Sequence, residues 1–320
     1  MANLAILQGP YLQQVLDHSF PLWHEGLSRE GYGRYYAAQL ATAWGRARLQ
    51  RFGLVEGSEV LASAKLYALD ALLDGTPIRV AGIGALFTTP AHRGHGHARA
   101  LVELLLERAR ADGAALALLF SIIGADYYAR LGFQPIATAD LSLRVIEDNR
   151  RGAPMTLVRA GEERDLPDIV ALGRARAERY RCSLDRDRDF LQYVIAKKRL
   201  LAGLGPIGMR QVQFFVAEEG NSAVAYVVIN ARDGTWTLEE CGDRDPAGAR
   251  AGAILQVLIA RDPSAPRPAI KGWLPSGFRP PQVEIVKETP SPEIMMMRAL
   301  GAPMPRITPD DFLFWHGDMF

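Results

Sequence analysis

Residues 84–111 contain the sequence feature that most restricts the fold of this chain. The segment 84–98, Gly-Ala-Leu-Phe-Thr-Thr-Pro-Ala-His-Arg-Gly-His-Gly-His-Ala, runs from a strand-like stretch through a proline-led turn into a glycine-rich loop. From Gly94 to Ala111, apolar residues recur at the spacing of an amphipathic helix. The segment therefore predicts a strand, a tight loop and a long helix that begins at the loop.

The start of this helix is suited to binding an anion. The first N–H groups of a helix have no intrahelical acceptor, and the helix dipole favours negative charge there. Gly94 and Gly96 carry no Cβ, so a diphosphate can approach their backbone closely. Taken alone, the motif is equally compatible with an ordinary glycine-containing turn before an amphipathic helix.

The segments around the loop predict an α/β (α+β) fold, with a twisted, mixed and mostly antiparallel sheet flanked by helices. Turn-forming sequences separate the strand-like runs, and the run after the long helix is apolar on both faces, as in a central strand. In chain order, we expect helices at 11–18 and 31–44, strands at 49–55, 60–69 and 79–87, the long helix, a strand at 114–122, a short helix at 127–128 and a strand at 135–146.

The length of 320 residues favours two domains. We place the boundary at the polar segment 148–154, which gives domains at 1–150 and 151–320. The second half echoes the first, and its proline-rich stretches read as loops, with Met295–Met297 as a strand at the edge of the core. The expected elements are strand 156–160, helix 166–180, strands 211–218, 223–230 and 235–241, helix 247–260, strand 269–274, and loops 262–268 and 275–292.

Composition excludes several classes of function. Lys and Arg number 37 and Asp and Glu number 36, so no basic excess indicates nucleic acid or an anionic membrane as a partner. Two cysteines, Cys182 and Cys241, are too few for a disulfide framework or a four-cysteine zinc site. With no signal-peptide pattern and no apolar run long enough to span a bilayer, we expect a cytoplasmic protein with reduced thiols.

Two motifs together resemble those of the GNAT superfamily of N-acetyltransferases. Arg93-Gly94-His95-Gly96-His97-Ala98 resembles its acetyl-CoA signature, Gln/Arg-x-x-Gly-x-Gly/Ala. Tyr128-Ala129-Arg130-Leu131-Gly132-Phe133 resembles its Tyr-x-x-x-Gly-Phe motif, about 30 residues downstream and after another strand. The resemblance covers roughly residues 30–145. The segment from Phe120 to Tyr128 resembles that of the yeast lysine N6-acetyltransferases. The two-copy layout, with an intact motif in the first copy, resembles that of the enhanced-intracellular-survival aminoglycoside acetyltransferases.

This resemblance implies acetyl-CoA as cosubstrate and no metal. The backbone of 94–99 would cradle the pyrophosphate, and the end of the preceding strand would pair with the pantetheine arm. Ser121 stands where many relatives carry Asn. The expected cofactor-binding residues are Leu86, Phe87, Thr88, Arg93, Gly94, His95, Gly96, His97, Ala98, Arg99 and Ser121. His92, His95 and His97 are interpreted as solvated loop residues, since no cysteine or paired carboxylate accompanies them.

The same resemblance assigns catalytic roles to Tyr128 and Phe320. Tyr128 would be the general acid, since a phenol with a pKa near ~10 suits a leaving thiol of ~8.5. The enhanced-intracellular-survival enzymes end in a Phe whose carboxylate acts as base, and this chain also ends in Phe. Other candidates for the base are His316, Glu56 and Asp70. The aromatic tail is also compatible with a last strand of the second domain.

The second half lacks the features of an active copy. At the corresponding strand–helix junction the sequence is Arg244-Asp-Pro-Ala-Gly-Ala, where Ala247 replaces the required Gly and Pro246 stiffens the loop. No Tyr-x-x-x-Gly-Phe motif follows. We therefore expect a degenerate GNAT-like domain that is structural and forms a wall of the acceptor site.

The sequence leaves three functions open. The first is N-acetyl transfer to a primary amine of a small molecule, such as an amino acid like lysine, a polyamine or an aminoglycoside. The second is acetylation of lysine or N-terminal amines of proteins. The third is a CoA-binding regulatory module without turnover, against which the intact Tyr128 argues. We favour the first, with a small-molecule amine as partner and no nucleic acid or membrane. Whether the chain forms a homo-oligomer stays open.

Overall fold

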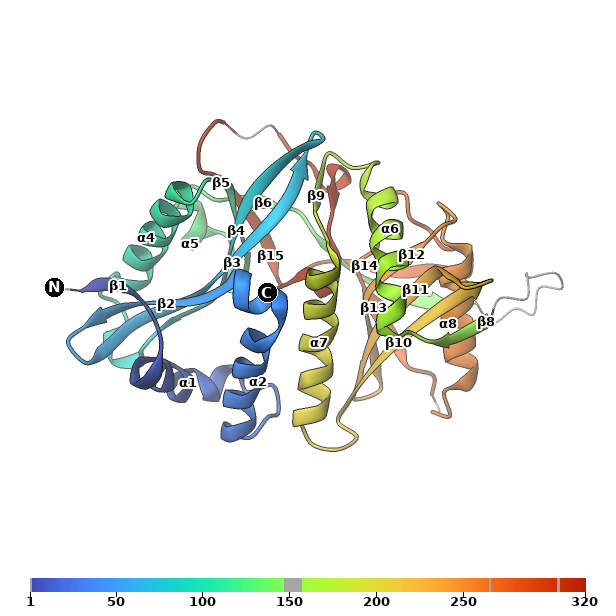
Figure 1. The fold of residues 1–320 in the computed structure, drawn as a ribbon, viewed down its shortest axis with the longest axis horizontal. Coiled ribbons are helices and arrows are strands. Elements are labelled where there is room, and N and C mark those ends of the chain that lie inside the picture. Colours follow the sequence, from blue (N-terminus) through green and yellow to red (C-terminus); the bar gives the residue numbers. More distant parts are fainter. Residues whose placement is uncertain (1, 147–156, 265, 304–305) are drawn as a thin grey trace. The chain divides into compact units, whose positions relative to one another are not determined.

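The structure is a computed structural model that describes residues 2–146, 157–264, 266–303 and 306–320 (Figure 1). It divides into two compact units. The first contains Met1–Ala137, Pro292–Thr308 and Phe320, and the second contains Thr138–Ser291 and Pro309–Met319. The expected boundary segment, 148–154, lies outside the described residues. The contacts instead place the change of unit between Ala137 and Thr138, which differs from the expected domains at 1–150 and 151–320.

The first unit is built around one mixed sheet with strand order β1-β2-β3-β4-β5-β15-β6. Among the described strands of this order the pairing is antiparallel, except for β4 and β5, which are parallel. Its elements are β1 (Asn3–Ile6), α1 (Gly9–Trp23), α2 (Arg29–Ala41), α3 (Ala43–Arg48), β2 (Leu49–Glu56), β3 (Glu59–Leu73), β4 (Thr76–Thr88), α4 (His97–Ala111), β5 (Ala114–Ser121), α5 (Asp126–Ala129), β6 (Gln134–Ile136) and β15 (Ile294–Ala299).

Local sequence explains the meander that precedes α4. The β3–β4 turn has positive φ at both central residues, 49° at Asp74 and 76° at Gly75, which matches the twist of a tight hairpin. Gly57 provides a positive φ of 59° in the β2–β3 turn. The predicted strands at 49–55, 60–69 and 79–87 are thus confirmed as β2, β3 and β4, each somewhat longer than expected.

Helix α4 covers one face of this sheet. Its apolar side, which includes Leu101, Val102 and Leu105, is fully buried against residues such as Ala64 and Ile83. Burying each of these side chains stabilises the fold by about 1.5–3 kcal/mol relative to exposure. Helices α1 and α2 pack near β2 and β3. Val15 of α1 contacts Val55 and Val60 of these strands. The position of α4 therefore follows from its 3.6-residue apolar periodicity.

The second unit repeats this arrangement. Its strand order is β14-β7-β13-β12-β11-β10-β8, and β12 and β13 are parallel, with α8 between them in sequence. Its elements are β7 (Ala139–Val145), β8 (Leu157–Ala160), α6 (Leu166–Ala177), β9 (Cys182–Leu184), α7 (Arg188–Leu204), β10 (Arg210–Glu219), β11 (Ser222–Arg232), β12 (Thr235–Asp243), α8 (Ala249–Arg261), β13 (Ala269–Gly272), β14 (Val283–Pro290) and β16 (Phe312–Leu313), which pairs in parallel with β9. The expected tandem layout is confirmed.

Three segments were assigned wrongly from the sequence. The single strand expected at 135–146 is two strands, because β6 ends at Ile136 in the first sheet and β7 begins at Ala139 in the second. The expected loop 275–292 contains β14, which pairs with β7. Met295–Met297 does not lie at a sheet edge, because β15 is hydrogen-bonded to both β5 and β6. In Figure 1 this C-terminal strand appears in red among the green strands of the first unit.

Candidate active site

The loop before α4 has an open backbone. Gly94 and Gly96 have φ angles of 82° and 81°, in the left-handed region that favours glycine, and Gly96 is the N-cap of α4. In the described part of the chain, nothing lies within 4 Å of a Cβ built on either glycine. No described side chain caps the first N–H groups of α4. These groups are therefore available to an anion, as the sequence predicted.

A cavity of 410 Å³ lies directly at this loop. Arg93, Arg99 and Arg130 line it together with His97 and Tyr127. Arg93 is held near the end of β4, because its Nε donates to the Thr88 carbonyl at 3.4 Å. Arginine groups beside a helix N-terminus form a site complementary to phosphate. The geometry thus fits a diphosphate in both charge and backbone access.

Strand β4 separates from β5 beside this loop. The parallel pairing runs from Arg79 to Ile83 on β4 and stops at Leu119 of β5, although both strands continue. A bulge follows at once, since the register with β3 shifts between Ser63 and Lys65. Ala85 adopts φ 48° there, a conformation that costs a non-glycine residue about 1–2 kcal/mol. After the bulge, the backbone of Leu86–Thr88 is not paired with β5 in the described register. That side of β4 can therefore hydrogen-bond to another extended molecule.

The tyrosine motif is shaped by Gly132. Its φ of 78° reverses the chain after α5, and the N–H of Phe133 then donates to the Tyr128 carbonyl at 3.1 Å. The two rings pack edge to face with centroids 6.1 Å apart. Tyr128 is 8% exposed within the core under α4, and burial raises the pKa of its phenol to about 12. It therefore stays protonated at neutral pH. Tyr127 is the residue that lines the loop cavity.

Phe320 lies on β4, next to the bulge. Its ring would contact a Cβ on Gly82 at 2.6 Å, and its carboxyl carbon and oxygen would lie 3.0 Å from a Cβ on Gly84. The ring also packs against Tyr67, at a centroid distance of 4.6 Å, and against Phe120, at 5.4 Å. Glycine is thus required at both positions, because Phe320 approaches the backbone too closely for a Cβ. The sequence showed two glycines within a strand but did not indicate what approaches them.

Comparisons with known proteins agree with this geometry. Residues 17–136 match a family model described as an acetyltransferase (GNAT) domain. The first unit contains a GNAT domain. No curated protein matches the sequence.

Solved structures share the fold of the GNAT domain and of most of the remaining chain. A GCN5-related N-acetyltransferase from Kribbella flavida is 20% identical, with a TM-score of 0.69, over 93% of this chain and 71% of that one. Eis1 from Mycobacterium abscessus is 17% identical, with a TM-score of 0.53, over 94% and 74%. N-myristoyltransferase from Saccharomyces cerevisiae, with bound myristoyl-CoA, is 10% identical, with a TM-score of 0.54, over 93% and 82%. At these identities the likeness establishes the fold.

The remaining predicted binding residues of the GNAT domain divide into two groups. Thr88, Gly94, Gly96, His97, Ala98 and Arg99 line the cavity with Arg93. His95 instead stacks on His97, and Phe87 packs against Trp23, at centroid distances of 6.0 and 5.8 Å. Leu86 packs against the core under α4. The Ser121 hydroxyl donates to the Gly124 carbonyl at 2.6 Å, so it stabilises the turn after β5.

The side-chain candidates for a base do not lie at the bulge. Asp70 forms an ion pair of 2.8 Å with Arg48 and is opposite Arg79, at the far end of the β3–β4 pairing. Glu56 is exposed at the end of β2. His316 belongs to the second unit, where its Nδ1 lies 3.1 Å from Glu239. Of the candidates named from the sequence, Phe320 is the residue that the structure describes at β4, with its backbone C and O atoms over Gly84.

The corresponding loop of the second unit is closed by its own carboxylates. Gly248 is the N-cap of α8 with φ 83°, which matches Gly96. The Asp243 carboxylate, however, accepts hydrogen bonds from the N–H groups of Arg250 and Ala251 at 2.7 and 2.9 Å. Asp245 accepts from Ala247 and Ala249. These acidic groups occupy the helix N-terminus that an anion would need, in addition to Pro246 and Ala247 noted in the sequence.

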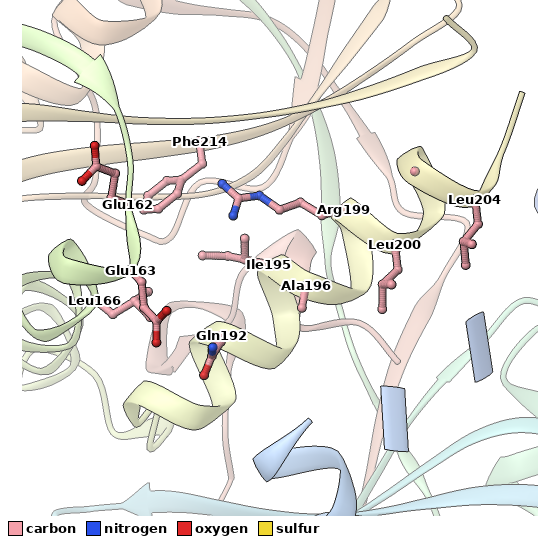
Figure 2. A pocket seen from close by; sticks show the side chains of 11 residues that line it. Glu162, Glu163, Leu166, Gln192, Ile195, Ala196, Arg199, Leu200, Leu204 and Phe214 are labelled. Atoms are coloured by element: carbon pink, nitrogen blue, oxygen red, sulfur yellow. The ribbon is translucent and has the colours of Figure 1, made fainter. Parts of the chain in front are cut away.

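The second unit also has a cavity of 500 Å³ beside α7 (Figure 2). Figure 2 shows Ile195, Leu200 and Phe214 among its apolar lining residues, together with the acidic Glu162 and Glu163. Glu163 is paired with Arg188 at 2.8 Å, and Glu162 is paired with Arg164. No tyrosine, histidine, cysteine or serine is among its described lining residues. The described lining of this cavity thus contains no phenol, imidazole, thiol or hydroxyl for proton transfer, and its two carboxylates are paired with arginines.

Two general properties of the described residues complete the picture. They contain no cluster of three or more His, Cys, Asp or Glu side chains that could hold a metal ion. Within the same ranges, no helix combines the length and apolar character needed to cross a membrane. Cys182 and Cys241 are free thiols and buried, and burial raises the pKa of Cys241 well above its ordinary value.

Proposed function

We propose that the GNAT domain transfers an acetyl group from acetyl-CoA to a primary amine of a small molecule. The observation that carries this proposal is the open N-terminus of α4, with its two left-handed glycines and its arginines, beside the separated end of β4. A diphosphate fits the first, and an extended amide-containing arm fits the second. The closed loop of the second unit supports one cofactor site per chain and a structural role for that unit.

The residues that would hold acetyl-CoA follow from this geometry. The backbone N–H groups of 94–98 would bind the diphosphate, with Arg93 and Arg99 adding positive charge. The backbone of Leu86–Thr88 would pair with the pantetheine arm after the bulge. When bound, acetyl-CoA supplies an acetyl group activated as a thioester. N–H groups near Leu86 and Phe87 are suited to polarising its carbonyl.

The proton transfers are assigned to Tyr128 and Phe320. A lysine-like amine with a pKa of ~10.4 must lose a proton to attack, which costs roughly 4–5 kcal/mol at pH 7. In the 320-residue chain, the Phe320 carboxyl group beside Gly84 would accept that proton. The ordinary pKa of a terminal carboxyl group is low, ~3.3–3.7. Tyr128, protonated at neutral pH, would donate a proton to the leaving thiolate.

The packing around β4 favours a small acceptor over a protein. The Phe320 ring fills the space above Gly82 and lies between Tyr67 and Phe120, which narrows the face on which the amine must arrive. A flexible small amine tolerates such a restriction more readily than a lysine within a folded protein.

A thiol-release assay tests the function. The chain is incubated with acetyl-CoA and a panel of amino acids, polyamines, aminoglycosides and lysine-containing peptides, and products are identified by mass spectrometry. We expect CoA release that matches the acetylated small amine. Preferential acetylation of peptides would replace the small-molecule acceptor with a protein. Acetyl-CoA binding without any acetylated product would indicate a regulatory module.

A further inference from the structure

Arg51 of β2 is buried without a matching negative charge. Its side chain is 2% exposed, and its Nε and Nη1 have no hydrogen-bond partner among the described residues. Its guanidinium carbon lies 5.3 Å from the ring centre of Tyr36 on α2. Burying an arginine in this way is unfavourable, because a buried charge normally requires an ion pair and satisfied hydrogen bonds. The described residues provide no ion pair for it.

The sheet register places Arg51 in line with the bulge of β4. Arg51 is directly opposite Lys65 on β3, and Lys65 is directly opposite Gly84 on β4. Paired positions on neighbouring strands point to the same face. Since strands are about 4.8 Å apart, the α-carbons of Arg51 and Gly84 are about 10 Å apart on this face. Gly84 is the residue on which the Phe320 carboxyl group lies.

Apart from the Phe320 carboxyl group at Gly84, this face carries positive charge and no acidic group among the described residues that the register assigns to it. Lys65 also approaches Tyr36, with its Nζ 5.5 Å from the ring centre. Burial raises the pKa of Tyr36 while Arg51 opposes that rise, which agrees with a cation held beside the phenol. None of the residues that the register assigns to this face near the bulge is Asp or Glu; they include Leu49, Arg51, Gly53, Ser63, Lys65, Tyr67, Leu69, Val80, Gly82, Gly84 and Phe87. The Ser63 hydroxyl is another buried polar group without a partner among the described residues.

We propose that Arg51 binds a carboxylate of the acceptor, so that the acceptor is an amine that also carries a carboxylate, as a free amino acid does. This inference rests on the proposed acetyl transfer and selects among its acceptors. A guanidinium offers a planar fork that matches a carboxylate. The acceptor would then place its amine at Gly84 and its carboxylate at Arg51, along the line of paired residues Arg51, Lys65 and Gly84. A polyamine or an aminoglycoside would bring further positive charge to this face.

Matched pairs of substrates test the inference on the unsubstituted chain. Lysine is compared with cadaverine, ornithine with putrescine, and phenylalanine with phenethylamine, each pair differing by the carboxylate. We expect kcat/KM to be about 10- to 100-fold higher for the amino acid, the usual effect of a hydrogen bond to a charged group. Equal or better acetylation of the decarboxylated amines would overturn the inference and leave the acetyltransferase function intact.

An Arg51→Met variant assigns the preference to this residue. We expect it to reduce the preference to within about threefold of unity, because the side chain keeps its bulk and loses its charge. Arg48→Met is the matched control, since Arg48 is a partly exposed arginine paired with Asp70, and it should keep the full preference. The ratio between the two members of a pair cancels differences in their amine pKa values. If Arg51→Met keeps the preference, Arg51 is not the carboxylate-binding residue.

A binding measurement separates this inference from the proposed function and does not depend on the variants. Lysine and cadaverine are titrated calorimetrically into the unsubstituted chain saturated with CoA. Tighter binding of lysine, again by about 10- to 100-fold, supports carboxylate recognition even if no transfer occurs. Equal affinities, or tighter binding of cadaverine, contradict it even if transfer is observed. Failure of the proposed function appears differently, as no acetylated product from either member of any pair.

Discussion

A Gly96→Glu substitution is expected to abolish acetyl-CoA binding. Gly96 is the N-cap of α4 at φ 81°, and no atom of the described residues lies within 4 Å of its Cβ position. The new side chain therefore meets open space where the diphosphate should lie. Two unit charges about 4 Å apart repel by about 4 kcal/mol at an effective dielectric constant of 20. At about 1.4 kcal/mol per tenfold, this corresponds to a loss of affinity of about 10²–10³-fold.

The chain offers a matched control in Gly75→Glu. Gly75 has φ 76°, also has nothing within 4 Å of its Cβ position, and lies in the β3–β4 hairpin turn. Both variants add one negative charge and force a non-glycine residue into the left-handed region. Each should therefore lower the free energy of unfolding by about 1–2 kcal/mol. Only Gly96→Glu removes a cofactor contact.

Isothermal titration calorimetry with acetyl-CoA, together with denaturant unfolding, distinguishes the two effects. We expect Gly75→Glu to bind like the unsubstituted chain and Gly96→Glu to show no measurable binding, with similar losses of stability. If both variants bind acetyl-CoA equally well, the loop before α4 is not the diphosphate site and the cofactor assignment fails.

Three further results are expected. Tyr128→Phe should lower turnover by about 10²–10⁴-fold with unchanged acetyl-CoA affinity, whereas Tyr127→Phe should lower turnover by less than about tenfold. Because burial raises the pKa of Tyr128 to about 12, its proton is lost only as the pH rises toward that value. The kcat should therefore show no alkaline decline from this group below about pH 10. Three residues added after Phe320 should lower turnover by at least about tenfold without affecting acetyl-CoA binding, and full turnover in a folded, extended chain would remove the catalytic role of its carboxyl group. Titration of the full chain should give one acetyl-CoA per chain, and a second acetyl-CoA site would contradict the interpretation of the second loop. Asp243→Ala should lower the free energy of unfolding by about 1–3 kcal/mol, because it leaves backbone N–H groups of α8 without partners.

The parts of the fold predicted correctly are those that local sequence determines. The turn residues before and after β3, the apolar periodicity of α4 and the two left-handed glycines of the loop act within a few residues of themselves. Each therefore leaves a pattern that can be recognised without knowing what it packs against. The same is true of Gly132, which fixes the geometry of the tyrosine motif.

The exchange of strands between the two sheets was not predictable in this way. β15, with Met295–Met297, takes the position next to the parallel strand of the first sheet, and β7 takes the equivalent position in the second. Both are short apolar strands that any similar edge could accept, so local pattern does not specify their partner.

The site residues that sequence reasoning missed depend on tertiary contacts. Arg51 is a charged residue within a strand, and its burial against Tyr36 of α2 depends on tertiary packing. Ala85 carries no sign of its positive φ, since non-glycine residues seldom adopt it. Asp243 could be recognised as a cap of α8 only once the end of β12 was known to lie beside the first turn of that helix.

The most direct test of the account is the stoichiometry of a single reaction. The unsubstituted chain is given acetyl-CoA and an amine panel that includes free amino acids, and CoA thiol and N-acetylated product are quantified together by colorimetry and mass spectrometry. The account predicts one N-acetylated amine for each thiol released, at a rate that falls by about 10²–10⁴-fold in Tyr128→Phe. Thiol release without any acetylated amine, or equal rates in the two proteins, would contradict it.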